Sequence, residues 1–193
     1  MRVVLASESP RRAELLRAAG FEIDIVPPGV EEQWLPGEEA EGYVRRLAAA
    51  KALAVSGTNG DKPIVGADTV VLAGGELLEK PSTDIEAARM LRLLSGRTHE
   101  VLTGVAVRFR GRHREHVERT RVRMAHLGDA EIAWYVASGE PRDKAGAYAV
   151  QGLASRFIEA IDGSYSNVVG LPVAAVYRLL REVMGSDTLN VSE

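Results

Sequence analysis

Two periods of hydrophobic and polar residues recur along the chain and predict its secondary structure. Short apolar or alternating runs rich in β-branched residues are typical of strands. Longer runs with apolar residues three or four apart are typical of helices, and the run 38–55 carries Tyr43, Leu47, Ala50 and Leu53 on its expected inward face. The pattern predicts strands at 3–6, 21–25, 64–72, 76–80, 99–109 and 112–124, and helices at 10–19, 38–55, 83–94, 129–137 and 172–184.

Turn and capping residues separate these elements. Ser9 is expected to cap the first helix with Pro10 at its first position, and a capping-box pattern begins at Thr83. Gly74 and Gly75 favour a hairpin. Strand–helix alternation combined with two hairpins predicts an α/β fold in which helices flank a mixed sheet. The 193 residues fit one domain spanning 1–193, or one domain with a lobe.

Composition narrows the classes of function. The chain is 46% hydrophobic and 26% charged, which is typical of a globular protein. It has no cysteine, so disulfides, a thiolate nucleophile and a cysteine-bound zinc are excluded, and any metal must bind oxygen or histidine ligands. No apolar run reaches the length of a signal peptide or a membrane span, so we expect a cytoplasmic protein without a membrane partner.

The predicted hairpin 99–124 is rich in arginine, which raises the possibility of nucleic-acid binding. Alternation favours another interpretation, because one face carries the charges while Val122 and Met124 point the other way, and Glu115 and Glu118 interrupt the positive field. We therefore expect a solvated edge strand and no stable nucleic-acid partner, in line with the net charge of -3. The arginines are Arg108, Arg110, Arg112, Arg114, Arg119, Arg121 and Arg123.

Residues 7–12 form a candidate anion site at a strand-to-helix junction. The end of the predicted strand meets the start of the helix there, so helix N–H groups, the hydroxyls of Ser7 and Ser9 and the guanidiniums of Arg11 and Arg12 converge. Arginine forks match phosphate oxygens, which makes the segment a candidate phosphate site. Ordinary helix capping with solvated arginines is the alternative interpretation.

Acidic and basic residues elsewhere could complete a phosphate-handling site. Asp68 stands in an apolar strand, where it needs a cation, a metal or hydrogen-bond donors; the alternative is an exposed strand end. Glu32 follows a proline turn and could supply a hard oxygen ligand to magnesium or manganese, or be a solvated charge. Lys51, late in a helix, and Lys80, at a strand end, could neutralise phosphates, although most single lysines are solvated.

Two glycine-rich segments, 138–148 and 162–172, look like pocket-lining loops. Polar and aromatic residues are interleaved with the glycines, and the second segment leads into a helix at Pro172. Plain turns explain many such strings. Gln151 follows the first segment, and its amide could bind the edge of a nucleotide base or satisfy the local backbone.

These residues stand in motifs that resemble, in order and over nearly the whole chain, those of the Maf family. The motifs are Ser7-x-Ser9-Pro10-Arg11-Arg12, Gly66-Ala67-Asp68-Thr69-Val70, Lys80-Pro81, Ser95-Gly96-Arg97-Thr98-His99-x-Val101-x-Thr103-Gly104-Val105, Gly139-Glu140-Pro141-x-Asp143-Lys144-Ala145-Gly146-Ala147-Tyr148 and Gly163-Ser164-Tyr165-x-Asn167-Val168-Val169-Gly170-Leu171-Pro172. The resemblance implies an elongated mixed α/β fold with a central cleft, similar to that of inosine triphosphate pyrophosphatases.

The resemblance also implies an activity, a metal and site residues. It implies hydrolysis of a nucleoside triphosphate to the monophosphate and pyrophosphate with a divalent cation, magnesium or manganese, and a possible homodimer. Asp68 would be the proton acceptor and a metal ligand with Glu32. The other implied substrate-binding or catalytic residues are Ser7, Arg11, Arg12, Lys51, Thr69, Lys80 and Gln151.

Three of these positions set the expected substrate, because Arg11, Thr69 and Gln151 resemble the branch that acts on dTTP and UTP, possibly including modified pyrimidine nucleotides. Two alternatives stay open at this stage. One is a nucleotide-binding regulator of cell division or septum formation without turnover. The other is a pyrophosphatase for 7-methyl-GTP or other modified purine nucleotides.

Overall fold

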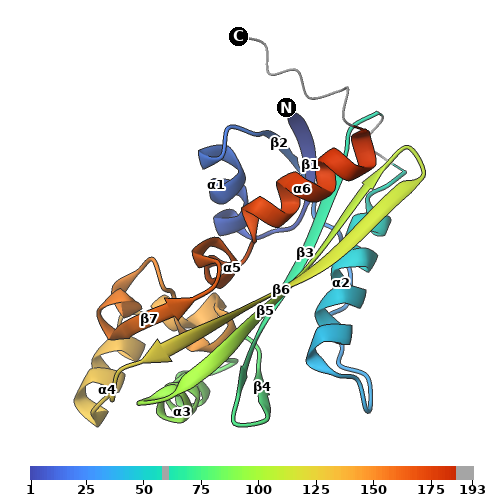
Figure 1. The fold of residues 1–193 in the computed structure, drawn as a ribbon. Coiled ribbons are helices and arrows are strands. Elements are labelled where there is room, and N and C mark those ends of the chain that lie inside the picture. The colour runs from blue at the N-terminus through green and yellow to red at the C-terminus, as the bar shows by residue number, and fades with distance from the viewer. Residues whose placement is uncertain (58–60, 186–193) are drawn as a thin grey trace. The chain divides into compact units, whose positions relative to one another are not determined.

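A computed structural model describes residues 1–57 and 61–185 of the chain, which form a mixed β-sheet flanked by helices (Figure 1). The strands are β1 (Arg2–Ala6), β2 (Glu22–Ile25), β3 (Ile64–Ala73), β4 (Glu76–Leu78), β5 (Thr98–Phe109), β6 (Arg112–Met124) and β7 (Ile158–Asp162). The α-helices are α1 (Pro10–Ala18), α2 (Ala40–Ala54), α3 (Asp84–Leu94), α4 (Asp129–Ala137), α5 (Tyr165–Val169) and α6 (Val173–Met184). The 3₁₀ helices are η1 (Glu140–Asp143), η2 (Ala145–Ala147) and η3 (Leu153–Phe157).

The sheet combines parallel and antiparallel pairs, as the sequence predicts. Its strand order is β2-β1-β3-β5-β6-β7, and β4 pairs with β3. β1 runs parallel to both β2 and β3, whereas the hairpin partner β4 and the last strand β7 are antiparallel to their neighbours. The predicted α/β class is confirmed. The elongated shape and the central cleft stay predictions.

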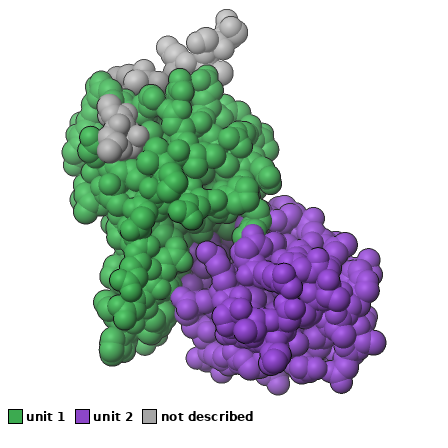
Figure 2. All heavy atoms as spheres, turned by 180° about the vertical axis from the view of Figure 1, so that it is seen from behind, with its two compact units in different colours: residues 1–68, 103–118, 170–193 green, residues 69–102, 119–169 purple. Residues whose placement is uncertain are grey.

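The chain divides into two compact units (Figure 2). Unit 1 consists of residues 1–68, 103–118 and 170–193, and unit 2 consists of residues 69–102 and 119–169. The strands β3, β5 and β6 therefore each supply residues to both units. The single domain over 1–193 stays a prediction. Among the described helices, none combines the length and the apolar composition that a membrane span requires.

Unit 1 has helices on both faces of its strands. On one face, α1 and α6 pack on β1, β3 and β5 in a buried apolar cluster that includes Leu5, Leu16 and Leu180. On the other face, α2 packs through Ala48 and Ala52 (Figure 1). Burial of apolar side chains on both faces explains why the central strands read as continuous apolar runs.

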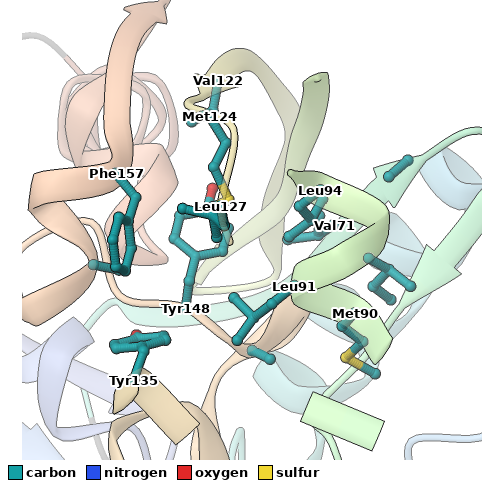
Figure 3. Close-up of a cluster of buried hydrophobic side chains, with 14 of the residues drawn as sticks. Val71, Met90, Leu91, Leu94, Val122, Met124, Leu127, Tyr135, Tyr148 and Phe157 are labelled. Atoms are coloured by element: carbon teal, nitrogen blue, oxygen red, sulfur yellow. The ribbon is translucent and has the colours of Figure 1, made fainter. Parts of the chain in front are cut away.

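Unit 2 has a core in which helices and 3₁₀ turns cover one face of its strands. Figure 3 shows side chains from β3, α3, β6 and α4 gathered around Tyr148, with Leu91, Met124 and Tyr135 among them. His99 is also buried in this unit, where its Nε2 lies 2.8 Å from the Tyr148 hydroxyl. Its Nδ1 has no hydrogen-bond partner among the described residues.

Several predicted details need correction. Leu53 is 54% exposed instead of facing inward, and the buried α2 residues beside it are Lys51 and Ala52. Ser9 is the N-cap residue of α1 but its side chain makes no capping hydrogen bond. β6 is not an edge strand, because β7, which the sequence did not predict, pairs with it. Part of each glycine-rich segment is helical: the first contains η1 and η2, and the second contains α5.

Candidate functional site

Two glycines let α2 approach the strands of unit 1 unusually closely. A Cβ atom on Gly66 would lie 2.4 Å from the carbonyl oxygen of Ala48 on α2, and one on Gly104 would lie 2.1 Å from that of Val44. Real Cβ atoms do not come this close to backbone, so only glycine permits this packing. Gly66 precedes Asp68 by two residues, which puts both on the same face of β3.

This close packing brings the Lys51 ammonium between two carboxylates. Lys51 Nζ donates to Asp68 Oδ1 at 2.7 Å and also to Glu32 Oε1. The side chains of Lys51 and Asp68 are only 5% and 7% exposed, whereas that of Glu32 is 42% exposed. Asp68 is therefore in the interior of the strand, and the alternative of an exposed strand end is wrong.

The environment of Asp68 perturbs its acidity in two opposing ways. Burial raises the pKa of the Asp68 carboxyl, while the positive charges of Lys51 and Arg12 lower it; the net shift is upward. A buried carboxylate of raised pKa that stays hydrogen-bonded to an ammonium is a suitable general base near neutral pH. Asp68 can therefore accept a proton while the positively charged Lys51 stays beside it.

Ser7 and Arg12 tie the first strand-to-helix junction to other segments of unit 1. Arg12 Nη1 donates to Ser7 Oγ at 3.2 Å and to the Ala67 carbonyl oxygen at 2.8 Å, and its Nε donates to the Gly170 carbonyl oxygen at 2.9 Å. Ser7 Oγ also accepts from the Ser9 amide. Arg12 thus supports the backbone beside Asp68 in addition to the phosphate-binding role that the sequence suggests.

The segment that carries Glu32 is anchored to α2 by residues that sequence reasoning missed. Arg46 donates to the Gln33 carbonyl oxygen at 2.9 Å, and its Nε and Nη2 donate to the two carboxylate oxygens of Glu38. The Trp34 ring lies 4.6 Å from that of Tyr43 on the same helix. A tryptophan and a charged pair flanking a predicted ligand are the signal that could have identified this anchor.

The structure places the remaining predicted residues in both units. Arg11 lies on α1 in unit 1 and is partly exposed. In unit 2, Thr69 follows Asp68 on β3, Lys80 follows β4 and is exposed, and Gln151 is exposed on a turn before η3. Unit 1 brings Ser7, Arg12, Glu32, Lys51 and Asp68 together. A common site that includes Thr69, Lys80 and Gln151 stays a prediction.

The two carboxylates around Lys51 are candidate ligands for a divalent cation. Among residues 1–57 and 61–185, no group of three or more His, Cys, Asp or Glu side chains is placed to hold a metal. Magnesium, however, is commonly bound through one or two carboxylates together with substrate phosphates. Glu32 and Asp68 already converge on one positive charge, so this oxygen pair fits a cation whose coordination a nucleotide would complete.

Fold and site together define a mixed α/β protein with a buried carboxylate–ammonium centre beside an arginine-bearing strand-to-helix junction. Its fold is similar to that of the Ham1 protein of Staphylococcus aureus, with a TM-score of 0.50, 12% identity and coverage of 94% of this chain and 99% of that one. At this identity the likeness shows the fold alone. The family model described as Maf-like protein matches residues 2–183, and the chain belongs to the Maf family.

Curated relatives are similar over almost their whole length. A protein of Koribacter versatilis is 49% identical over 94% of both chains, and one of Anaeromyxobacter dehalogenans is 52% identical over 93% of both. A third, from Geobacter sp. strain M21, is 50% identical over 94% of this chain and 95% of its own. All three are named dTTP/UTP pyrophosphatase.

Proposed function

We propose that this protein is a nucleoside triphosphate pyrophosphatase that hydrolyses dTTP and UTP to the monophosphate and pyrophosphate. Relatives about half identical over more than nine tenths of the chain bear the name dTTP/UTP pyrophosphatase. The observation that carries the chemistry is the buried Asp68 carboxylate, hydrogen-bonded to Lys51, which also contacts Glu32. Such a centre unites a base with positive charge for an anionic substrate.

In the proposed reaction, water attacks the α-phosphorus of the nucleoside triphosphate, and the oxygen that bridges the α and β phosphates leaves with pyrophosphate. A bond forms from the water oxygen to phosphorus, the phosphorus–oxygen bond of the leaving group breaks, and pyrophosphate departs. Asp68 accepts the proton of the attacking water, and its raised pKa suits that role. Ser7, Arg11, Arg12, Lys51 and Lys80 bind the phosphates.

Glu32 and Asp68 are the residues that would hold a magnesium or manganese ion. When bound, this ion would neutralise the charge on phosphate oxygens and on the leaving group. Lys51 contacts the same two carboxylates, so it keeps them close together and lowers their mutual repulsion.

The proposed substrate preference depends on Arg11, Thr69 and Gln151. The exposed Gln151 amide has both a donor and an acceptor, so it can pair with the complementary edge of a pyrimidine. If Gln151 selects the base, Gln151→Glu removes the donor and lowers the preference for dTTP over 7-methyl-GTP. An unchanged profile would exclude this role.

The test is pyrophosphate release from dTTP, UTP, CTP, 7-methyl-GTP and ITP, with magnesium or manganese, for the wild type and Asp68→Asn. We expect turnover of dTTP and UTP that falls about 10²- to 10⁴-fold in Asp68→Asn, with a smaller change in nucleotide affinity. Nucleotide binding without pyrophosphate release would indicate a regulator instead. Preferred turnover of 7-methyl-GTP or ITP would indicate a purine-directed enzyme.

We also propose that the protein forms a homodimer and is located in the cytoplasm. A dimer predicts a mass in sedimentation equilibrium of twice the chain mass of 20.8 kDa. A single species at the chain mass would refute it.

A further inference from the structure

The turn that presents Gln151 is held on both sides by one pair of side chains in unit 2. The Gly152 amide donates to the Ala149 carbonyl oxygen at 3.0 Å, so Gln151 is the third residue of a four-residue turn. Ala149 and Val150 are buried while Gln151 is exposed. The turn therefore presents one polar side chain from an otherwise fixed segment.

Tyr135 anchors the segment before Gln151. The Ala149 amide donates to Tyr135 Oη at 3.1 Å, and this hydroxyl donates in turn to Glu140 Oε1 at 2.8 Å. Tyr135 is fully buried on α4, and its ring packs edge-to-face against Phe157. Burial and the bond to Glu140 raise the pKa of the Tyr135 phenol, which keeps it protonated as a donor.

Glu140 anchors the segment after Gln151. Its carboxylate accepts from the Leu153 amide at 2.9 Å and from the Ala154 amide at 3.4 Å. Gly152 lies against this carboxylate, since a Cβ there would be 2.3 Å from Glu140 Oε2. A side chain at position 152 would displace Glu140 and release both amides.

We propose that Tyr135 and Glu140 are positioning residues for base selection, because they fix both ends of the 149–154 segment and so determine where the Gln151 amide meets the nucleotide. This inference rests on the proposed role of Gln151. A hydrogen-bonding side chain discriminates between bases only when its position is fixed in advance, since a mobile one loses selectivity and must be ordered on binding. The two anchors provide that fixed position without touching the substrate.

The kinetic test compares kcat/KM for dTTP with kcat/KM for ITP. Tyr135→Phe and Glu140→Gln keep the shape of the side chains, and we expect each of them, like Gln151→Ala, to lower the dTTP:ITP ratio roughly tenfold. When Tyr135→Phe is added to Gln151→Ala, the ratio should fall no further, because both changes act through the same amide. A general loss of stability would not produce this dependence.

Amide hydrogen exchange provides a second readout that does not depend on turnover. Exchange at Ala149, Leu153 and Ala154 should accelerate in Tyr135→Phe and Glu140→Gln. Glu131→Gln is the matched control, because Glu131 also accepts a backbone amide in unit 2, that of Gly128, away from the turn. It should change neither the exchange of the segment nor the substrate ratio.

The outcomes separate the two proposals. If Gln151→Ala lowers the ratio and the anchor variants do not, or if exchange of the segment is unchanged, the positioning role is wrong while the proposed function stands. If Gln151→Ala itself leaves the ratio unchanged, the selectivity role of Gln151 is wrong and the positioning role is overturned with it. If the double variant falls well below Gln151→Ala, Tyr135 acts by another route.

Discussion

At the scale of single residues, the proposed chemistry depends on the Lys51 ammonium, which pairs with two carboxylates. Lys51 is buried, and it reaches Asp68 on a strand and Glu32 on a loop. An unpaired buried charge is costly, so each member of this group depends on the others. Removing one member should change the acidity of another, and that change can be measured.

Replacing Lys51 with methionine should move the acid limb of the pH–kcat/KM profile. The pKa of Asp68 is raised by burial and lowered by Lys51. Without this ammonium the pKa rises further, so Asp68 is deprotonated only at higher pH and the limb should shift upward by roughly 1–3 units. Lys62→Met is the control, because Lys62 pairs with Asp24 and is 41% exposed. An unshifted limb in Lys51→Met would show that Asp68 is not the titrating base.

Because His99 is buried in the core of unit 2, we expect acid to lower the free energy of unfolding. Burial lowers the pKa of His99 from 6.5 to about 4. Below pH 6.5 the unfolded chain binds a proton that the folded chain does not, so stability is complete above that pH and is lost as the pH falls toward 4. The loss should reach about 3 kcal/mol.

Urea unfolding at a series of pH values measures this loss, and His99→Gln, which does not titrate, is the comparison. The wild type should lose more stability than the variant between pH 6.5 and pH 4. Equal losses would show that protonation of His99 is not responsible.

At the scale of elements, the site depends on how closely α2 packs against the strands. Gly66 and Gly104 remove the side chains that would hold the helix away. The distance between helix and strand then lets Lys51 reach Asp68 within hydrogen-bonding range. The catalytic geometry is therefore a property of this contact as much as of the charged residues.

Gly66→Ala should separate α2 from β3. The new methyl group would meet the backbone of Ala48 and Ala52, which cannot move aside as a flexible side chain can. We expect a stability loss of roughly 1–3 kcal/mol in urea unfolding and a fall in kcat at temperatures where the variant stays folded. Gly57→Ala, with nothing within 4 Å, is the control. If folded Gly66→Ala retains the wild-type kcat, the catalytic geometry does not depend on the contact between α2 and β3.

Most elements could be predicted from the sequence, whereas the phase of α2 could not. Alanines at positions 48, 49, 50 and 52 are small and apolar on several faces, so the period alone does not identify the buried face. It predicts Leu53 inside, whereas Lys51 is buried and Leu53 is exposed. β7 escaped prediction because it is short and carries Glu159 and Asp162, which pair with arginines of β6. Both features, the phase of α2 and the presence of β7, depend on contacts between residues that lie far apart in the sequence.

Some features of the candidate site could likewise be predicted from the sequence, and others could not. Asp68 could be identified because a carboxylate in an apolar strand requires a partner. The partner itself could not be deduced, since Lys51 lies 17 residues away in a helix that reads as ordinary. The positioning role of Tyr135 and Glu140 could not be deduced either, because it depends on the hydrogen bonds of the folded turn.

At the scale of the whole molecule, the two units share three strands. Residues of β3, β5 and β6 belong to both units, so the chain passes from one unit to the other within each of these three strands. Strands shared in this way oppose independent unfolding, because neither unit retains its full set of strands without the other. We therefore expect one cooperative transition.

The chain's two tryptophans can test this cooperativity, because Trp34 lies in unit 1 and Trp134 lies in unit 2. Trp34→Phe leaves a reporter only in unit 2, and Trp134→Phe leaves one only in unit 1. In each variant, urea unfolding followed by fluorescence and by circular dichroism should have the same midpoint. A fluorescence midpoint that departs from the circular dichroism of the same variant would indicate separate unfolding of the units.

The interleaved path of the chain through its units also has a consequence for synthesis on the ribosome. The last segment of unit 2 ends at residue 169, before α6, whose Val176, Leu179 and Leu180 complete an apolar cluster of unit 1. All of unit 2 has therefore been translated before α6 adds its side chains to the cluster that β1 and α1 begin. The apolar cluster that the first strand starts is among the last to be completed, and α6 completes it.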